Sequence, residues 1–251
     1  MKKGNNPPKE KVERVERDEL NPQQKALTKI KIAFKCKTEN QKKFVRLIND
    51  NQIIVCAGPA GTGKTYVACA EALRLLAKGV YKKIIVAKSV TVLEGEEVGF
   101  LKGTLKEKME PIMISFMDNF HKIIGKSLTE ELERCELIEI TPLAYIRGRS
   151  IDDSIIIVDE SQNITLKNMR STMTRIGDNS KMILLGDTKQ IDISKRDASS
   201  LSKIIKLFGD HEEIAVMEFA REDIVRNKLI IEIERIFDDY EESLVPPKKN
   251  T

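Results

Sequence analysis

The sequence predicts a single α/β domain in which a mostly parallel sheet is covered by helices on both faces. Short apolar runs rich in β-branched residues alternate along the chain with segments whose apolar residues recur at helical spacing. This alternation is typical of a parallel sheet that is buried on both sides. The chain has 251 residues, of which 41% are hydrophobic, so one domain with extensions accounts for it better than two full domains.

Each predicted element follows from the local pattern. Six apolar runs of strand length occur in order, at residues 53–57, 83–88, 137–140, 155–158, 181–185 and 213–219. The segments between and after them predict helices at residues 66–76, 105–120, 166–176, 201–208 and 224–237. A further helix is expected to begin near Thr38 or Asn40, either of which can cap it. Residues 94–103 are punctuated by glycines and predict a loop.

The two ends of the chain are polar. Residues 1–24 mix Lys, Arg, Glu and Pro with little apolar content and predict a flexible charged extension, and residues 241–251 predict a polar tail. The folded domain is therefore expected at residues 25–240. Its first part is basic, because lysines at positions 25, 29, 31, 35 and 37 alternate with apolar residues. Such lysines can hold a phosphate backbone, but a charge run is more often a solvated face, which is the interpretation favoured by the sequence alone.

Composition excludes several classes of protein. The formal net charge of +4 is too small to indicate nucleic-acid binding by itself. The four cysteines are scattered without a C-x-x-C pair, which predicts reduced residues in a cytosolic protein and neither disulfides nor a zinc site. No apolar run approaches membrane-spanning length, and no apolar signal segment opens the chain.

One glycine-rich stretch between the first strand and the following helix predicts a phosphate-binding loop. Its sequence GPAGTGKT fits the pattern G-x-x-x-x-G-K-[ST]. Backbone N–H groups of such a loop converge on phosphate oxygens, and the helix N-terminus adds a favourable dipole. The lysine would reach the β- and γ-phosphates, and the threonine hydroxyl would bind Mg²⁺. The predicted nucleotide-binding residues are Gly58, Pro59, Ala60, Gly61, Thr62, Gly63, Lys64 and Thr65.

Two further polar groups follow strands. Asp159 and Glu160 end the most apolar strand, and ligands of parallel α/β sheets collect at the carboxyl ends of strands. Asp159 is predicted to hold Mg²⁺, and Glu160 to orient or polarise the attacking water. Gln190 follows the next strand and is predicted to contact the γ-phosphate and the water through its amide. On the alternative interpretation, these polar residues only form turns.

These three motifs, in this order, resemble the motor domains of superfamily-one helicases. The match extends to the PhoH family of phosphate-loop ATPases, whose phosphate loop typically reads GPAGTGKT, as in this chain. Six other segments are similar to family motifs, namely residues 94–103, 147–150, 157–163, 180–181, 186–192 and 223–227. The resemblance covers roughly residues 37–240 and implies a RecA-like phosphate-loop NTPase that uses ATP and Mg²⁺.

The resemblance also implies roles for two residues outside the three motifs. Gln41 is similar to the adenine-reading glutamine of helicase motors, although it can also be an exposed residue of a helix cap. Arg226 is the candidate arginine finger at the γ-phosphate. It can alternatively be a surface arginine early in the last helix, and arginines at positions 147, 149 and 175 compete for the finger role.

The expected function is Mg-dependent ATP hydrolysis coupled to movement along, or remodelling of, single-stranded nucleic acid, RNA over DNA. Because the chain has one motor core, a finger supplied by a neighbour would require a homo-oligomeric ring, a hexamer by family analogy. The first alternative is a nucleotide-dependent oligomeric switch in a stress or phosphate-starvation response, without motor activity. A second alternative, a small-molecule phosphotransferase, fits less well because Glu160 and Gln190 favour water as the acceptor.

Overall fold

A six-stranded parallel sheet forms the centre of the protein, as the apolar runs predict. The structure is a computed structural model that describes residues 21–88, 105–191, 199–226 and 228–244. The strand order is β3-β2-β4-β5-β1-β6, and every pairing in this sheet is parallel. The strands are β1 (Ile53–Ala57), β2 (Lys83–Lys88), β3 (Ile138–Pro142), β4 (Ser154–Asp159), β5 (Lys181–Gly186) and β6 (Ile214–Glu218). The predicted loop at residues 94–103 lies outside the described residues.

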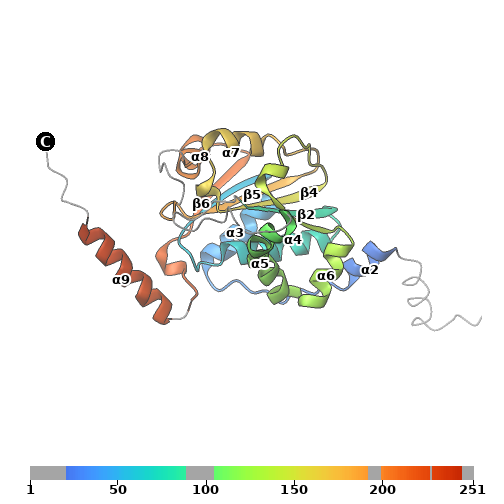
Figure 1. The fold of residues 1–251 in the computed structure, drawn as a ribbon, viewed down its shortest axis with the longest axis horizontal. Helices are drawn as coiled ribbons and strands as arrows, with labels where there is room; N and C mark the ends of the chain where they lie inside the picture. Colours follow the sequence, from blue (N-terminus) through green and yellow to red (C-terminus); the bar gives the residue numbers. More distant parts are fainter. Residues whose placement is uncertain (1–20, 89–104, 192–198, 227, 245–251) are drawn as a thin grey trace, which may run out of the picture.

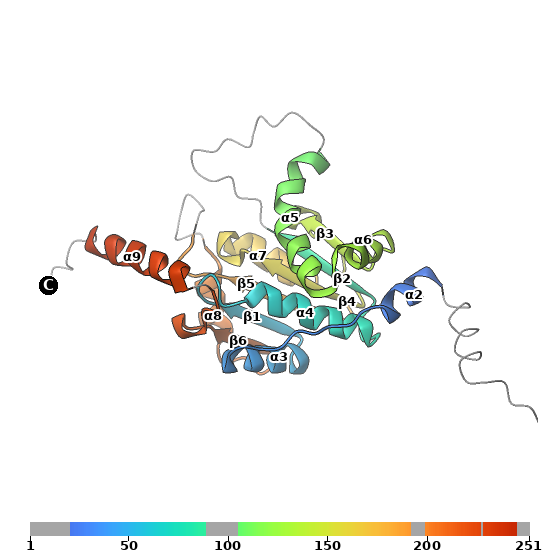
Figure 2. The same cartoon turned by 90° about the horizontal axis from the view of Figure 1, so that it is seen from below.

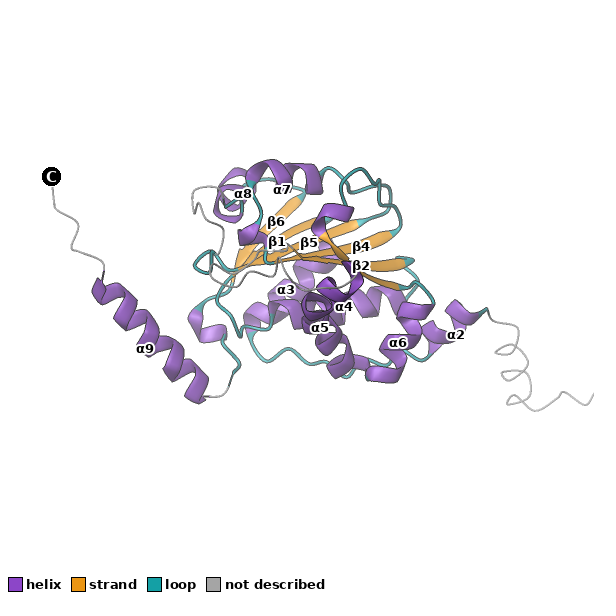
Figure 3. Ribbon diagram, in the orientation of Figure 1, coloured by secondary structure: helices purple, strands orange, loops and turns teal. Residues whose placement is uncertain are grey.

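Helices cover both faces of the sheet (Figures 1 and 3). They are α2 (Pro22–Thr28), α3 (Glu39–Asp50), α4 (Lys64–Ala77), α5 (Leu105–Ile124), α6 (Lys126–Arg134), α7 (Leu166–Met173), α8 (Leu201–Phe208) and α9 (Lys228–Leu244). On one face α3, α4, α5 and α6 pack together, and on the other α7 and α8 do. The α/β fold with helices on both faces is therefore confirmed.

The central strands are apolar throughout because both of their faces are buried. In β4, Ile155 and Ile157 join the core beneath α3 and α4, whereas Ile156 and Val158 join the core beneath α7 and α8. All four side chains have no exposed surface. A strand with one solvated face would show alternating polar residues, so the unbroken run reflects two-sided burial.

The helix boundaries agree with the sequence in some places and differ in others. Thr38 caps α3, because its hydroxyl accepts a hydrogen bond from Gln41 N at 3.2 Å. Two short helices, α2 and α6, were not predicted. The closing helix begins at Lys228 rather than near residue 224, because residues 221–226 form a short 3-10 turn and an extended segment that contacts the phosphate-binding loop.

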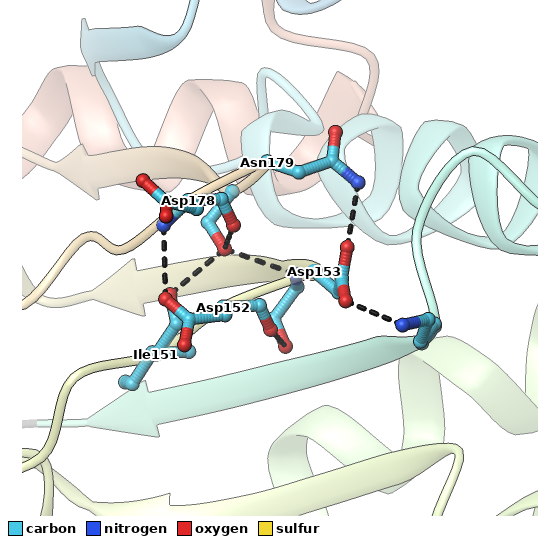
Figure 4. Close-up of polar contacts among 8 residues, drawn as sticks. Ile151, Asp152, Asp153, Asp178 and Asn179 are labelled. Carbon is cyan, nitrogen blue, oxygen red and sulfur yellow. Dashed lines mark hydrogen bonds and ion pairs between the residues drawn. The ribbon is translucent and has the colours of Figure 1, made fainter.

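A polar network joins the starts of β4 and β5, at the end of the sheet opposite the phosphate loop (Figure 4). Asp152 Oδ1 accepts from Asp178 N at 2.9 Å, and Asn179 Nδ2 donates to Asp153 Oδ1 at 2.8 Å. Asp153 and Asn179 have φ values of 52° and 48°, a left-handed conformation that Asp and Asn tolerate. Because both the Asp152 and the Asp153 carboxylates accept hydrogen bonds, we interpret these residues as structural. They link the segments that precede β4 and β5 and so fix the register of the two strands.

The last helix extends away from the body of the molecule (Figures 1 and 2). It exposes large apolar side chains along its length, including Leu229, Ile233, Ile236, Phe237 and Tyr240. Within the described residues, no helix is long and apolar enough to cross a membrane.

Cys56 and Cys69 are buried in the core, Cys36 and Cys135 are half-buried, and all four are free thiols.

Candidate nucleotide-binding site

The carboxyl ends of β1, β4 and β5 meet because β5 pairs with both of the other strands. A pocket of about 400 Å³ opens at this edge. Its lining brings together residues from all three predicted motifs: Ala60, Gly61, Gly63, Lys64, Thr65, Tyr66, Asn119, Asp159, Glu160, Gly186, Asp187, Gln190, Val225 and Arg226. The position agrees with the rule that parallel sheets bind ligands outside the carboxyl ends of their strands.

The phosphate loop is held together by its own lysine. Lys64 Nζ donates to the carbonyl oxygens of Gly58 and Pro59, at 2.6 and 2.8 Å. Burial lowers the pKa of the Lys64 ammonium, whereas the nearby carboxylates of Asp187 and Asp159 act in the opposite direction. Lys64 lines the pocket, where a bound phosphate would compete with the two carbonyl oxygens for its ammonium group.

A glycine is required at position 61 for two reasons. Its φ is +83°, and a Cβ built there would lie 2.6 Å from Arg226 Cδ. Any larger residue would strain the backbone and displace the arginine. Gly63 directly precedes α4, so the N-terminus of that helix faces the pocket and favours an anion there.

Thr65 and Asp159, the two predicted Mg²⁺ ligands, lie side by side, and their binding of a metal stays a prediction. Thr65 Oγ1 donates to Asp159 Oδ2 at 3.0 Å. Burial and the neighbouring Glu160 raise the pKa of Asp159, so a nearby cation would stabilise its ionised form. A hydroxyl and a carboxylate beside a phosphate cradle are oxygen ligands of the type that Mg²⁺ prefers, and the donor set fits this ion.

Glu160 is held on both sides of its carboxylate. Its backbone φ of 52° places it in the left-handed region, which is unusual for a residue with a side chain and is often found at functional sites. Gln162 Nε2 donates to Oε2 at 2.7 Å, and Lys88 Nζ lies 3.6 Å from Oε1. Gln162 also accepts a hydrogen bond from Asp187 N at 3.1 Å. This amide therefore connects Glu160 to the end of β5.

Gln190 lies at the rim of the same pocket, and its side chain is exposed. The turn before it is fixed by a hydrogen bond from Lys189 N to Asp187 Oδ1 at 2.9 Å. The sequence prediction that Gln190 contacts a γ-phosphate and water stays a prediction.

Gln41 lies behind the phosphate loop and is 3% exposed. Its Nε2 donates to Thr62 O at 2.9 Å, and its Oε1 accepts from Lys37 N at 2.7 Å. Both ends of the amide therefore brace the loop from behind. Its predicted contact with adenine stays a prediction, and that contact would require one of these hydrogen bonds to open.

Arg226 lines the pocket of its own chain, which differs from the arrangement expected for a ring. The preceding residue, Val225, donates from its N–H to Gly61 O at 3.0 Å and so ties this segment to the phosphate loop. Of the competing arginines, Arg149 is paired with Glu139 at 2.7 Å. Within the described residues, Arg226 is the only one of the four candidate arginines that lines the pocket. Arg226 therefore needs no neighbouring copy to reach the phosphate loop.

Sequence reasoning did not assign roles to several residues that build the site. Asp223 is 5% exposed and accepts from Asn40 Nδ2 at 2.6 Å and from Ala220 N at 3.0 Å. Burial alone would raise the pKa of Asp223, but these hydrogen bonds lower it. The anchored carboxylate holds the segment that carries Arg226. The sequence signal for Asp223 was the motif at residues 223–227, and that for Gln162 was the motif at residues 157–163. Tyr66 and Asn119 gave no separate signal.

Comparison with known proteins finds related sequences over most of the chain. The family model PhoH, described as "PhoH-like protein", matches residues 33–238. A PhoH-like protein of Bacillus subtilis is 40% identical over 206 residues, which are 82% of this chain and 64% of that protein. Protein PhoH of Escherichia coli is 34% identical over 195 residues, 77% of this chain and 55% of that protein. The chain thus spans somewhat more than half the length of these relatives.

Among solved structures, the large terminase of a thermophilic bacteriophage is similar at 10% sequence identity, with a TM-score of 0.48. The similar region covers 79% of this chain and 49% of the terminase chain. The family is shown by the sequence matches, which extend over most of the described domain. The chain belongs to the PhoH-like protein family.

Proposed function

We propose that this protein binds Mg-ATP and hydrolyses it to ADP and phosphate. The observation that supports the proposal most directly is that Lys64, Thr65, Asp159 and Glu160 line one pocket at the strand ends. A cation to neutralise phosphates, a pair of hard oxygen ligands and a carboxylate for water are the components that phosphoryl transfer to water requires.

The proposed roles follow from position. Lys64 and the loop N–H groups bind the phosphate oxygens, and Thr65 and Asp159 hold Mg²⁺, which neutralises charge on the β- and γ-phosphates when bound. Glu160 accepts a proton from the water that attacks the γ-phosphorus, as the bond from that phosphorus to the bridging oxygen breaks and ADP leaves.

The remaining two roles concern the γ-phosphate itself. Gln190, at the pocket rim, orients the attacking water. Arg226 offers its guanidinium to the charge that develops on the transferred group. Because Arg226 packs against Gly61 of the same chain, this arginine is proposed to act in cis rather than on a neighbouring subunit.

We further propose that hydrolysis is coupled to single-stranded nucleic acid, RNA over DNA, in a homo-oligomer, a hexamer by family analogy. The position of Arg226 gives no reason for a ring. Support for self-association comes instead from α9, which projects from the body and exposes apolar side chains over several turns. Such a stripe is typical of interaction sites rather than of free surface.

Steady-state ATP hydrolysis measured against increasing single-stranded RNA and DNA tests the coupling. We expect polymer to raise the rate, and Lys64→Ala and Glu160→Gln to abolish it. If turnover depends on both residues but ignores both polymers, the motor proposal is wrong and the nucleotide-dependent switch is favoured. If turnover survives both substitutions, the assignment of the site is wrong.

A further inference from the structure

Residues 30–37 connect α2 to α3 as an extended segment that runs along α4 (Figure 2), and we call this segment the basic strap. We propose that the basic strap, together with the exposed basic residues of α3, binds the phosphate backbone of a single-stranded nucleic acid and is coupled to the phosphate loop. This inference rests on the proposed function, because it locates the surface that holds the polymer.

The strap alternates between buried and exposed side chains. Ile30, Ile32 and Phe34 are partly buried and pack against the core beneath α4. Lys31, Lys35 and Lys37, in contrast, are exposed. In an extended chain, alternate residues are about 6.6 Å apart and share one side. Lys35 and Lys37 are therefore one such step apart, and Lys31 lies two steps, about 13 Å, before Lys35, with Ala33 between them. The three lysines thus form a row along one side of the strap.

The charge of this region is strongly one-sided. Between residues 31 and 46 the sequence carries six basic side chains and one acidic side chain, Glu39. Glu39 is already paired with Lys42 at 2.6 Å. On α3, Lys42, Lys43 and Arg46 are all exposed. The net charge of the whole chain is small, but this region forms a local basic surface. A surface of this kind is expected where a protein contacts nucleic-acid phosphates.

The strap is fixed in place rather than loosely solvated. The Arg74 guanidinium donates to Phe34 O at 3.1 Å and lies 5.7 Å from the centre of the Phe34 ring. Arg74 is itself paired at 3.0 Å with Glu71, which is 2% exposed. A row of lysines on a fixed backbone loses less conformational freedom on binding than the same lysines on a flexible tail.

Two separate series of contacts connect the basic strap to the nucleotide pocket. The Phe34 ring packs edge-on against Tyr66 at a centroid distance of 5.6 Å, and Tyr66 lines the pocket. Separately, Lys37 N donates to the Gln41 amide, which in turn donates to Thr62 O in the phosphate loop. A polymer that holds the strap would therefore influence the loop through both contacts.

The chemistry of the surface favours phosphate over bases. The exposed positions of the strap are Lys31, Ala33, Lys35 and Lys37, none of which offers an aromatic ring for stacking. Binding would thus be independent of base sequence and steeply dependent on salt. An acidic protein segment is the competing partner for such a surface, and the test below distinguishes it.

The experiment measures binding of a fluorescent 20-nucleotide oligo(U) by anisotropy over a series of KCl concentrations. One variant carries Lys31→Ala, Lys35→Ala and Lys37→Ala. The matched control carries Arg170→Ala, Lys203→Ala and Lys206→Ala, three exposed positions on α7 and α8 at the other face of the sheet. The melting temperatures of both variants should equal that of the wild type, because all six side chains are exposed.

For the strap variant, loss of three phosphate contacts should reduce the slope of log K against log[KCl] by about 2, at roughly 0.7 per contact with a single strand. The same contacts correspond to an affinity loss on the order of 100-fold at about 0.1 M salt. The control should bind like the wild type, and polymer stimulation of ATP turnover should fall for the strap variant only.

Three results would overturn the inference. If the wild type binds oligo(U) and the strap variant binds it equally well with the same salt slope, the strap is a solvated face and the polymer site lies elsewhere, although the proposed function stands. If the wild type binds no polymer, both the inference and the nucleic-acid part of the proposed function are wrong. If polyglutamate binds and oligo(U) does not, the strap recognises an acidic protein instead.

Discussion

Gln162→Ala is predicted to lower both stability and the rate of ATP hydrolysis, because this buried amide joins two strands at the site. Its side chain makes one hydrogen bond to the Glu160 carboxylate, at 2.7 Å, and accepts one from Asp187 N, at 3.1 Å. Gln162 is 1% exposed and Asp187 is 8% exposed, so water does not replace the hydrogen bond to Asp187 N without rearrangement. The substitution thus leaves a buried N–H without an acceptor.

The magnitude follows from these two bonds. A neutral hydrogen bond contributes about 1 kcal/mol and one to a charged group about 1.5–3 kcal/mol. Because the Glu160 side chain is 36% exposed, the charged bond belongs at the low end of that range. We expect a total loss of about 2–3 kcal/mol in the free energy of unfolding, measured by urea denaturation. Because a freed Glu160 carboxylate is misplaced for the attacking water, kcat should fall about 10- to 100-fold with little change in KM for ATP.

Gln52→Ala is the matched control. Gln52 Nε2 donates to Ser180 O at 3.2 Å, at the opposite end of the sheet, so its loss should cost about 1 kcal/mol and leave kcat unchanged. The reasoning would be refuted if Gln162→Ala destabilised the protein no more than Gln52→Ala does, or if it changed KM and left kcat intact.

Three further predictions follow from other contacts. Thr65→Ala should raise the Mg²⁺ concentration that gives half-maximal ATP turnover, whereas Thr65→Ser, which keeps the hydroxyl beside Asp159, should not; equal effects would contradict the metal assignment. Burial would raise the pKa of Glu139, but hydrogen bonds from Arg149 and Lys83 lower it below 4.5, so the stability this carboxylate adds is present above that pH and is lost as pH falls through its folded-state pKa. Because Glu139 and Arg149 are 26% and 39% exposed, solvent screens this pair, and Glu139→Gln should lower the unfolding free energy by only about 1 kcal/mol at pH 7. The difference in unfolding free energy between the two proteins should shrink as the pH falls, and a difference that stays constant would contradict the reasoning. Because α9 is the proposed self-association surface, Phe237→Glu should shift the sedimentation coefficient toward that of a monomer, and an unchanged coefficient would contradict that proposal.

The strands could be predicted from sequence because burial on two faces leaves a direct trace in the residue types. The run at residues 155–158, for example, lies inside β4, Ser154–Asp159. The helix α6 left no such trace, because its sequence is largely polar and its buried residues are only Thr129 and Leu132. Ile224 and Val225 resemble the start of a helix, but they belong to the segment that contacts the phosphate loop.

The parts of the candidate site that lie within the sequence motifs could be predicted. That Asp159 and Thr65 come within hydrogen-bond distance was predictable from the strand–loop–helix context. The bridge through Gln162 and the position of Arg226 against Gly61 were not, because both depend on the order of strands in the sheet and on chain segments far apart in sequence. The lysine alternation was visible in the sequence, but only the structure shows which side of the strap faces solvent.

Single-turnover hydrolysis of γ-labelled ATP by the Glu160→Gln variant, measured together with its equilibrium affinity for Mg-ATP, tests the central claim most directly. The account predicts that the variant binds Mg-ATP within a few-fold of the wild type and hydrolyses it at least about 100-fold more slowly, because loss of a general base costs about 10²- to 10⁴-fold. Hydrolysis at the wild-type rate with unchanged affinity would contradict the assignment of Glu160, and with it the proposal that this pocket is an ATPase site.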